Sequence, residues 1–215
     1  MESETAPRLS GRQAQAARND RLILEAAREV FTADSEAPIA AVAERAGVGI
    51  SALYRRFRSK EDLLRHLTLE GLQRYIAIAE AALADKRDPW EAFAIFMREA
   101  VDADTHALTV HLAGTFTPSE THWREGERAE ALNERLLARM KDAGVLRRDV
   151  GVGDLSLLFQ QLASIELGNR ERTLQLRHRY LALILEALRA PGKGPLPGPS
   201  PSWEEIRGQF TPKVR

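Results

Sequence analysis

Apolar residues recur every three or four positions along most of the chain, and no stretch alternates between apolar and polar residues as a strand does. This pattern predicts an all-α fold of about nine helices. The predicted segments are residues 15–33, a short helix that begins near Pro38, 49–57, 59–83, a helix that begins at Asp88-Pro89, 105–116, 120–143, 154–167 and 172–189.

Short polar residues and glycines predict where several of these helices begin and end. Gly47 and Gly144 are placed to end helices, since glycine adopts the left-handed conformation of a helix end at little cost. Ser59 is expected to cap the next helix, whose first turn carries two acidic residues. Asp88 followed by Pro89 is a typical helix start.

The segment at residues 49–57 has an unusual outer face. Leu53 and Phe57 lie four positions apart and are expected to point inward. The side chains left outside are Ser51, Ala52, Tyr54, Arg55 and Arg56. The basic residues between positions 51 and 60 have no carboxylate among them. A short, firmly anchored helix with a basic and hydroxyl-bearing outer face is suited to a DNA groove.

The residues that carry a resemblance to a known family form a turn, a short helix and a capped helix start at fixed spacing. They are Phe31, Val42-Ala43, Ala46-Gly47-Val48, Leu53-Tyr54, Phe57, Ser59-Lys60-Glu61 and Leu63-Leu64. With this set the chain resembles the tetracycline-repressor (TetR) family of bacterial transcription regulators over about residues 15–65. The resemblance implies an N-terminal three-helix, helix-turn-helix DNA-binding domain and a C-terminal helical domain for ligand binding and dimerisation.

The resemblance also implies which residues contact DNA. They are Gly49, Ile50, Ser51, Ala52, Tyr54, Arg55, Arg56 and Lys60. The first four would approach base edges, while the tyrosine and the two arginines would line the major groove and its phosphates. Lys60 would reach a phosphate beside the first amides of the following helix. The family typically has histidine where Arg56 stands, and the sequence leaves open whether this arginine reads guanine or holds the backbone.

The chain departs from the family pattern before its second helix. The link between Phe31 and Val42 is shorter than is usual, and Ala37 stands where a threonine cap is expected. Alanine cannot accept a hydrogen bond from the helix amides, which costs about 1 kcal/mol of local stability. It also cannot direct a hydroxyl at a phosphate.

Basic residues are concentrated near the start of the chain. The formal net charge of the whole chain is zero, so only a local charge can attract nucleic acid. Between Arg8 and Lys60 the basic residues exceed the acidic ones, a sign that suits phosphate contact. A flexible basic arm over residues 1–14, with Arg8, Arg12 and then Arg18, is predicted to enter the minor groove or to follow the backbone. A disordered leader without contacts is the alternative.

Composition changes again near the end of the chain. The predicted divisions are the arm at 1–14, a DNA-binding domain at 15–65, a helical regulatory and dimerisation domain at 66–189 and a tail at 190–215. Proline and glycine dominate residues 191–201, which is typical of a linker without a packed core. After it, Trp203, Ile206 and Phe210 are expected either to form a short docking turn or to remain unordered.

The last two long helices are apolar on more than one side. Their candidate dimer-interface residues are Leu155, Leu158, Phe159, Leu162, Tyr180, Leu181, Ile184 and Leu188. A helix that is apolar nearly all round has to be covered on both faces, and a second copy of the chain is the simplest additional cover. The alternative is that these helices form the central core of one subunit.

Aromatic and flexible apolar side chains concentrate in the middle third of the chain. The candidate residues of a ligand pocket are Tyr75, Trp90, Phe93, Met97, His106, His111, Phe116 and Trp123. Such a set can line a cavity for a small apolar or amphipathic ligand, with a few polar groups to orient it. Aromatic residues at helical spacing also form ordinary core, and the sequence leaves both interpretations open.

Several classes of protein are not indicated. The chain has no cysteine, which excludes disulfides and thiol redox sensing, and its histidines lack the spacing of a metal site. No phosphate-binding loop or nucleophile elbow occurs, so we expect neither an enzyme nor a cofactor. The polar start lacks the apolar region of a signal peptide, and no apolar run is long enough to span a membrane. A cytoplasmic bacterial protein is expected.

The residues and the resemblance together predict a homodimeric transcription regulator, most simply a ligand-responsive repressor of a pseudo-palindromic operator. Its two recognition helices would enter successive major grooves, about 34–36 Å apart. A ligand in the aromatic core would tilt the fourth helix and change this spacing. The alternative is an all-helical dimeric ligand-binding or interaction protein without operator binding, which the missing threonine cap and the short first link favour.

Overall fold

The computed structural model describes residues 11–112, 114–192 and 194–209, without the side chains of residues 11–17, 107, 109 and 110. Ten helices and no strand occur within these ranges. The nearest approach to a sheet there is one antiparallel bridge between Leu146 and Arg189. The predicted all-α class is confirmed, with one helix more than the expected number of about nine.

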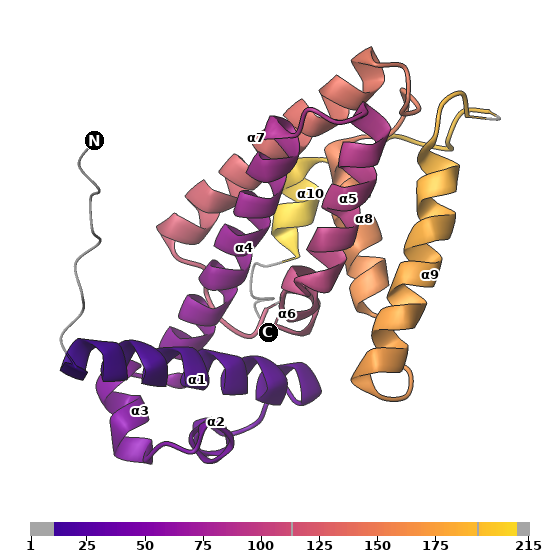
Figure 1. Cartoon of the computed structure of the whole chain (residues 1–215). Coiled ribbons are helices and arrows are strands. Elements are labelled where there is room, and N and C mark those ends of the chain that lie inside the picture. The colour runs from indigo at the N-terminus through magenta and orange to yellow at the C-terminus, as the bar shows by residue number, and fades with distance from the viewer. Residues whose placement is uncertain (1–10, 113, 193, 210–215) are drawn as a thin grey trace, which may run out of the picture. The chain divides into compact units, whose positions relative to one another are not determined.

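The helices are divided between two compact units, Met1–Leu67 and Thr68–Arg215. The first unit contains α1 (Gly11–Ala33), α2 (Ile39–Ala46), α3 (Ile50–Arg56) and the start of α4 (Lys60–Ala84) (Figure 1). The second unit contains the rest of α4 and all later helices. Helix α4 therefore contributes residues to both units without interruption.

The first unit is held together by the apolar faces of its short helices. Its buried side chains are Ile23, Ala26, Ala27, Phe31, Ala37, Ile39, Val42, Ala43, Leu53, Phe57, Leu63, Leu64 and Leu67. Leu53 and Phe57 are both fully buried, as their spacing predicted. Their burial fixes the rotation of α3 about its axis, so the opposite face of that helix is exposed.

The ends of these helices follow the local signals in part. Gly47 ends α2 in the left-handed conformation, with φ of 65°. Ser59 caps α4, because its Oγ accepts a hydrogen bond from the Asp62 amide at 3.0 Å. The cap of α2 is Pro38 and not Ala37, which is buried instead. Neither side chain can accept a hydrogen bond, so the predicted lack of a side-chain cap remains.

The second unit is built from α4 and six further helices. These are α5 (Pro89–Asp102), α6 (Thr105–Leu112), α7 (Glu120–Asp142), α8 (Val152–Ala163), α9 (Arg170–Leu188) and α10 (Trp203–Gly208) (Figure 1). Helix α5 packs on α7, α8 and α9, while α8 also contacts α6, α7 and α10. One apolar core, from Tyr75 to Leu188, joins α4, α5, α7, α8 and α9.

Polar caps define the helix starts of this unit. Asp88 Oδ1 accepts hydrogen bonds from the Trp90 and Glu91 amides at 3.0 and 3.1 Å, as expected for an Asp-Pro start. Ser119 caps α7 together with His122, whose Nδ1 accepts from the Ser119 amide at 3.2 Å. Gly144 then follows the end of α7 with φ of 71°.

Two predicted helix ends are wrong. Helix α6 stops at Leu112 and not at residue 116, and α8 stops at Ala163 and not at residue 167. Arg177 explains the early end of α8: its guanidinium donates hydrogen bonds to the carbonyl oxygens of Ala163 and Ile165, at 2.7 and 3.2 Å. Those carbonyls therefore need no further helical turn to satisfy them.

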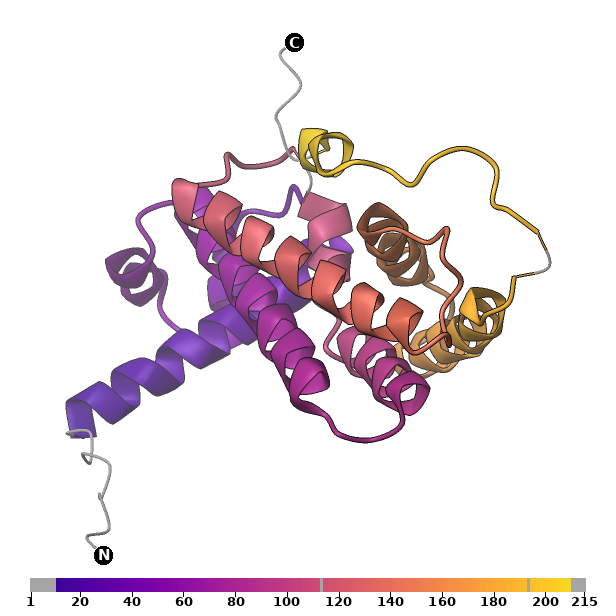
Figure 2. The ribbon, with the colours of Figure 1, turned by 90° about the horizontal axis from the view of Figure 1, so that it is seen from above.

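Within residues 194–209 the proline-rich tail forms hydrogen bonds with the rest of the second unit. Arg147 donates to the carbonyl of Gly194 at 2.6 Å, and the Leu196 amide donates to Asp149 at 2.8 Å. Figure 2 shows the connection leaving the end of α9 and passing outside α8 to reach α10. Ile206 of α10 is buried, which favours the docking turn over the unordered alternative. Phe210 lies outside the described residues.

Candidate DNA-binding surface and ligand cavity

The exposed face of α3 begins at its N-cap, Gly49. Ile50 and Tyr54 are 40% and 48% exposed although both are large and apolar. We use the term α3 surface for Gly49, Ile50, Ser51, Tyr54, Arg55 and Arg56, all of which are exposed. Ala52 is half-buried. Seven of the eight predicted DNA-contacting residues thus lie on or next to one short helix.

The two arginines of the α3 surface differ in their partners. Arg56 Nε lies 2.7 Å from Asp20 Oδ2 of α1, and its guanidinium lies 5.5 Å from the centre of the Phe57 ring. Arg55 forms no ion pair with any residue that the structure describes. Arg55 is therefore the arginine whose charge is available to a phosphate, while Arg56 is partly neutralised by Asp20.

Lys60 has a different place from the predicted one. Its Nζ donates a hydrogen bond to the carbonyl oxygen of Ser35 at 2.8 Å and lies 5.2 Å from the centre of the Phe31 ring. The ammonium group is directed at the link between α1 and α2, where a carbonyl outside a helix needs a donor. Lys60 therefore stabilises the first unit in this structure, and its phosphate contact stays a prediction.

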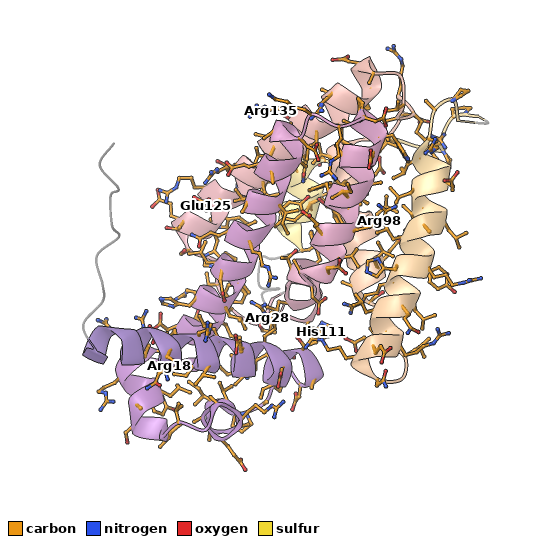
Figure 3. All side chains as sticks on the ribbon, viewed as in Figure 1. Arg18, Arg28, Arg98, His111, Glu125 and Arg135 are labelled. Carbon is orange, nitrogen blue, oxygen red and sulfur yellow. The ribbon has the colours of Figure 1, made fainter. Side chains whose placement is uncertain are left out.

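The predicted basic arm is only partly within the described residues. Arg8 and the side chain of Arg12 lie outside them. Residues 11–14, which the sequence assigned to the arm, belong to α1. Arg18 is exposed on the same helix (Figure 3).

The second unit contains a cavity of about 390 Å³ between α4, α6, α7, α8 and α10. Four of the predicted pocket residues line it: Tyr75, His106, Phe116 and Trp123. Small residues, including Gly71 and Gly126, also face it. Gly71 leaves space at this wall, whereas the Trp203 ring fills the side of Gly126, 3.1 Å from where a Cβ atom would lie.

Four other predicted pocket residues lie elsewhere. Trp90, Phe93 and Met97 of α5 are buried in the apolar core and do not line the cavity. They face away from it because α5 packs on α7 and α9, and a cation, Arg189, covers the Trp90 ring at 4.7 Å. His111 is directed outward to Glu166, with Nε2 3.4 Å from Oε1 (Figure 3).

One end of the cavity is polar and buried. The Tyr75 hydroxyl of α4 donates a hydrogen bond to Asn133 Oδ1 of α7 at 2.8 Å. Burial raises the pKa of Tyr75, so this hydroxyl stays protonated. His106 lies beside them: its ring is 5.1 Å from the Tyr75 ring and stacks on Phe159 at 4.7 Å. Burial lowers the pKa of His106 to about 4, so its imidazole is neutral at pH 7.

The charged part of the cavity wall is acidic. Glu130 and Glu134 of α7 line it, and neither lysine nor arginine does so in the described parts of the chain. Burial raises the pKa of Glu130, and the nearby carboxylates of Glu134, Glu127 and Glu204 raise it further. The electrostatic potential of this wall is therefore unfavourable for an anion.

The C-terminal segment Ser200–Ile206 forms another wall of the cavity. It fits closely against the start of α8, since a Cβ atom on Gly153 would lie 2.1 Å from the Pro201 carbonyl oxygen. A Cβ on Gly151 would lie 2.4 Å from Ser200 Oγ, which accepts a hydrogen bond from the Asp154 amide at 3.2 Å. We call Ser200–Ile206 the tail wall.

Aromatic side chains also hold the C-terminal segment against α7. Trp203 lies against Gly126 of α7, and the Arg207 guanidinium lies 4.3 Å from the centre of the Trp123 ring. The indole N–H of Trp203 is buried and has no acceptor among the described residues. Sequence reasoning assigned no cavity role to this segment, although the pair Gly151 and Gly153 was a signal of close approach.

The outer faces of α8 and α9 differ from the predicted dimer interface. Five of its residues are buried within the unit: Leu155, Phe159, Leu162, Leu181 and Leu188. Leu158 and Ile184 are half-buried. Tyr180 is 49% exposed and Leu183, which was not predicted, is 61% exposed. These two residues, with Leu176 and Ala187, follow one side of α9 at helical spacing, and we call them the α9 strip.

Within the described ranges no three side chains that could ligate a metal lie together. None of the helices in those ranges combines the length and apolarity needed to cross a bilayer.

Comparison with family models gives two matches. Residues 23–67 match the model of bacterial regulatory proteins of the tetR family, and residues 88–190 match that of the C-terminal domain of SbtR-like transcriptional regulators. No curated protein sequence matches the chain significantly.

Solved structures give matches over most of the chain. A TetR transcription regulatory protein from Mycobacterium vanbaalenii is 28% identical, with 82% of this chain and 98% of that chain covered and a TM-score of 0.58. PfmR from Thermus thermophilus is 25% identical, with 81% and 99% covered and a TM-score of 0.56. LfrR from Mycobacterium smegmatis, solved in complex with proflavine, is 21% identical, with 78% and 96% covered and a TM-score of 0.54.

Proposed function

The chain belongs to the TetR family of transcriptional regulators, and we propose that it is a ligand-responsive repressor that binds a pseudo-palindromic operator as a homodimer. Its membership makes it a DNA-binding transcription factor and not an enzyme, as the sequence indicated. Operator binding, dimerisation and the response to a ligand are the properties that we propose. The observation that carries the proposal is the exposed α3 surface within the segment that matches the family's DNA-binding model.

DNA recognition is assigned to the α3 surface. Ser51 and the start of α3 would face base edges, while Tyr54 and Arg55 would contact the groove wall and its phosphates. Ile50 offers an apolar contact of the kind that a thymine methyl group accepts. Arg56 would join them once DNA phosphates compete with Asp20 for its guanidinium.

Dimerisation is assigned to α8 and α9. The α9 strip places exposed apolar side chains on one side of a 19-residue helix, and the half-buried Leu158 extends this apolar area to α8. A two-fold axis through such a surface pairs each residue with its counterpart in the second copy. Two α3 surfaces held in this way would read two half-sites one helical turn apart.

Ligand response is assigned to the cavity of the second unit. Helix α4 supplies Lys60–Leu67 to the first unit, and its residues Thr68, Gly71, Leu72 and Tyr75 line the cavity. A ligand that fits one arrangement of α4 better than another would bias the spacing of the two α3 surfaces. A coupling free energy of about 1–3 kcal/mol would change operator affinity about five- to 150-fold.

Selection of bound duplexes from a random DNA pool tests the proposal. A two-fold symmetric sequence with half-sites about 34–36 Å apart should be enriched, and its affinity should fall steeply as salt rises. Substituting Arg55→Ala should weaken this binding, whereas Arg179→Ala on the exposed face of α9 should not. If no sequence is enriched, the alternative of a dimeric ligand-binding or interaction protein without operator binding is favoured instead.

A further inference from the structure

Only the oxygen of the Asn133 side-chain amide forms a hydrogen bond with a described residue. Asn133 is only 5% exposed, and its Oδ1 accepts the Tyr75 hydroxyl at 2.8 Å. In this orientation Oδ1 of the amide faces the phenol and Nδ2 faces away from it. The Nδ2 group, with its two N–H donors, bonds to no residue that the structure describes.

Asn133 also lines the cavity, as do both side chains beside it, Tyr75 and His106. A molecule in the cavity therefore meets Nδ2 of Asn133 as an available donor. The imidazole next to it is neutral at pH 7, and the phenol remains protonated. The polar end of the cavity thus offers hydrogen bonds but no positive charge.

The remaining wall argues against an anionic ligand. Its two carboxylates, Glu130 and Glu134, are the charged side chains of the wall within the described parts of the chain. A carboxylate or phosphate moved from water into this cavity would lose hydration and meet no cation. A carbonyl oxygen loses much less hydration and can accept directly from Asn133.

We propose that the cavity binds a small, uncharged and mostly apolar molecule whose carbonyl oxygen accepts a hydrogen bond from Asn133 Nδ2, with Tyr75 as the positioning residue. This inference rests on the proposed ligand-responsive function and names the chemistry of its ligand. Tyr75 acts through Asn133, because its hydroxyl holds Oδ1 and so directs Nδ2 away from it. The volume of about 390 Å³ suits a small ligand.

A set of probes with ten carbon atoms each tests the ligand class. Binding of γ-decalactone, decanoate and decylammonium to the full-length protein is measured by calorimetry at pH 7.5. The lactone offers a neutral carbonyl, decanoate an anion, and decylammonium a cation without an acceptor. The lactone should bind at least about tenfold more tightly than either ion. Its carbonyl gains the hydrogen bond from Asn133, and it has no charge to be removed from water, whereas both ions lose the hydration of their charge. Tighter binding of decanoate or of decylammonium would overturn the inference.

Substitutions at position 133 test the residue. Asn133→Asp keeps an oxygen for Tyr75 but replaces the N–H donors, and Asn133→Leu removes all hydrogen-bonding atoms at a similar volume. Both should weaken lactone binding about tenfold, while the affinity for N-phenyl-1-naphthylamine, an apolar reporter, should change less than twofold. Retained reporter binding shows that the cavity is still formed. Equal losses for both probes in both variants would show that Asn133 is only structural.

The positioning role of Tyr75 needs a spectroscopic readout. The carbonyl stretching band of bound ¹³C-labelled γ-decalactone should be shifted to lower frequency by the Asn133 hydrogen bond. Tyr75→Phe should leave a broader, less shifted band, because the amide then rotates between orientations, whereas Asn133→Leu should abolish the shift. An unshifted band in the unaltered protein, or the same band with Tyr75→Phe, would overturn the assignment.

Failure of this inference can be separated from failure of the proposed function. If decanoate binds best and also releases operator DNA, the protein is ligand-responsive and only the ligand class is wrong. If none of the three probes or the reporter binds, and operator affinity is unaffected by all of them, the ligand-responsive function fails together with the inference.

Discussion

Arg56 on α3 and Asp20 on α1 form an ion pair, with Nε and Oδ2 2.7 Å apart. Both side chains are partly exposed, so the pair contributes little to folding stability. Its effect is on the α3 surface, where a carboxylate occupies the guanidinium that the family resemblance assigns to DNA. Asp20 therefore neutralises part of the positive charge of the α3 surface in the absence of DNA. DNA phosphates would have to displace this carboxylate in order to bind Arg56.

Substituting Asp20→Ala should raise the affinity for DNA. Breaking an exposed pair frees about 0.2–1 kcal/mol, which corresponds to an increase of up to about fivefold at low salt. Fluorescence anisotropy with operator and with unrelated duplex measures it. Glu29→Ala is the matched control, because it removes the partner of Arg45 on α2 and makes the same change of net charge. Equal increases for both variants would mean that only net charge matters.

Lys60 and Arg55 should differ in how their substitution affects DNA binding. Lys60→Met removes the hydrogen bond to Ser35 and should lower the free energy of unfolding by about 1–2 kcal/mol, measured by urea denaturation. The dependence of operator affinity on salt concentration should stay the same. Arg55→Ala should leave stability unchanged but reduce that salt slope by about 0.9 for each phosphate that the variant no longer neutralises. A reduced slope with Lys60→Met would restore the phosphate contact that the sequence predicted.

The α9 strip should be needed for dimerisation. Leu183→Asp places a charge in the middle of the proposed interface, where it would be buried without a partner, so the protein should sediment as a monomer. Operator affinity should fall with it, since one α3 surface reads only one half-site. Leu196→Asp is the control, because Leu196 is also exposed but lies in the connection to α10. A dimeric Leu183→Asp protein would contradict the assigned surface.

Arg177 should be important for the stability of the second unit. It is buried, bonds to the carbonyls of Ala163 at the end of α8 and of Ile165 after it, and pairs with Asp104. Arg177→Met should lower the free energy of unfolding by about 3 kcal/mol, since buried partners lose their donor. Arg179→Met on the exposed side of the same helix should change it by less than about 0.5 kcal/mol. Similar small effects of both variants would show that the Arg177 contacts are dispensable.

Gly153→Ala should displace the tail wall. The new Cβ would lie 2.1 Å from a backbone oxygen of Pro201, and a backbone atom cannot move aside as a flexible side chain does. Amide hydrogen exchange of residues 202–208 should accelerate, while that of α9 stays unchanged. Gly208→Ala, where a Cβ meets no atom within 4 Å, is the control. Unchanged protection in Gly153→Ala would show that α10 does not depend on this close fit.

Features set by neighbouring residues could be predicted from the sequence. The burial of Leu53 and Phe57 follows from their four-residue spacing, and the start of α5 follows from Asp88 and Pro89. Features set by distant residues could not. The acceptor of Lys60 is a backbone carbonyl 25 positions earlier, and no local pattern identifies it.

The residues that line the cavity could likewise be predicted only in part from the sequence. Helices α5 and α7 are both amphipathic and aromatic, so the pattern alone placed Trp90 and Trp123 in the same pocket. Only Trp123 lines it, because the cavity lies between α4, α6, α7, α8 and α10, and α5 contributes no residue to its wall. Gly126 was the signal that the sequence contained, since a glycine inside a helix is costly unless something lies close to it, and the Trp203 ring lies there.

The fit between the tail wall and α8 also constrains how this protein can diverge. Glycine at 151 and 153 allows the tail wall, and with it α10, to pack against the start of α8. A bulkier residue at either position would collide with Ser200 or Pro201. The two regions are therefore expected to change together during evolution. Homologues that carry larger residues at these positions should have lost the C-terminal helix or moved it elsewhere, leaving the corresponding cavity open on that side.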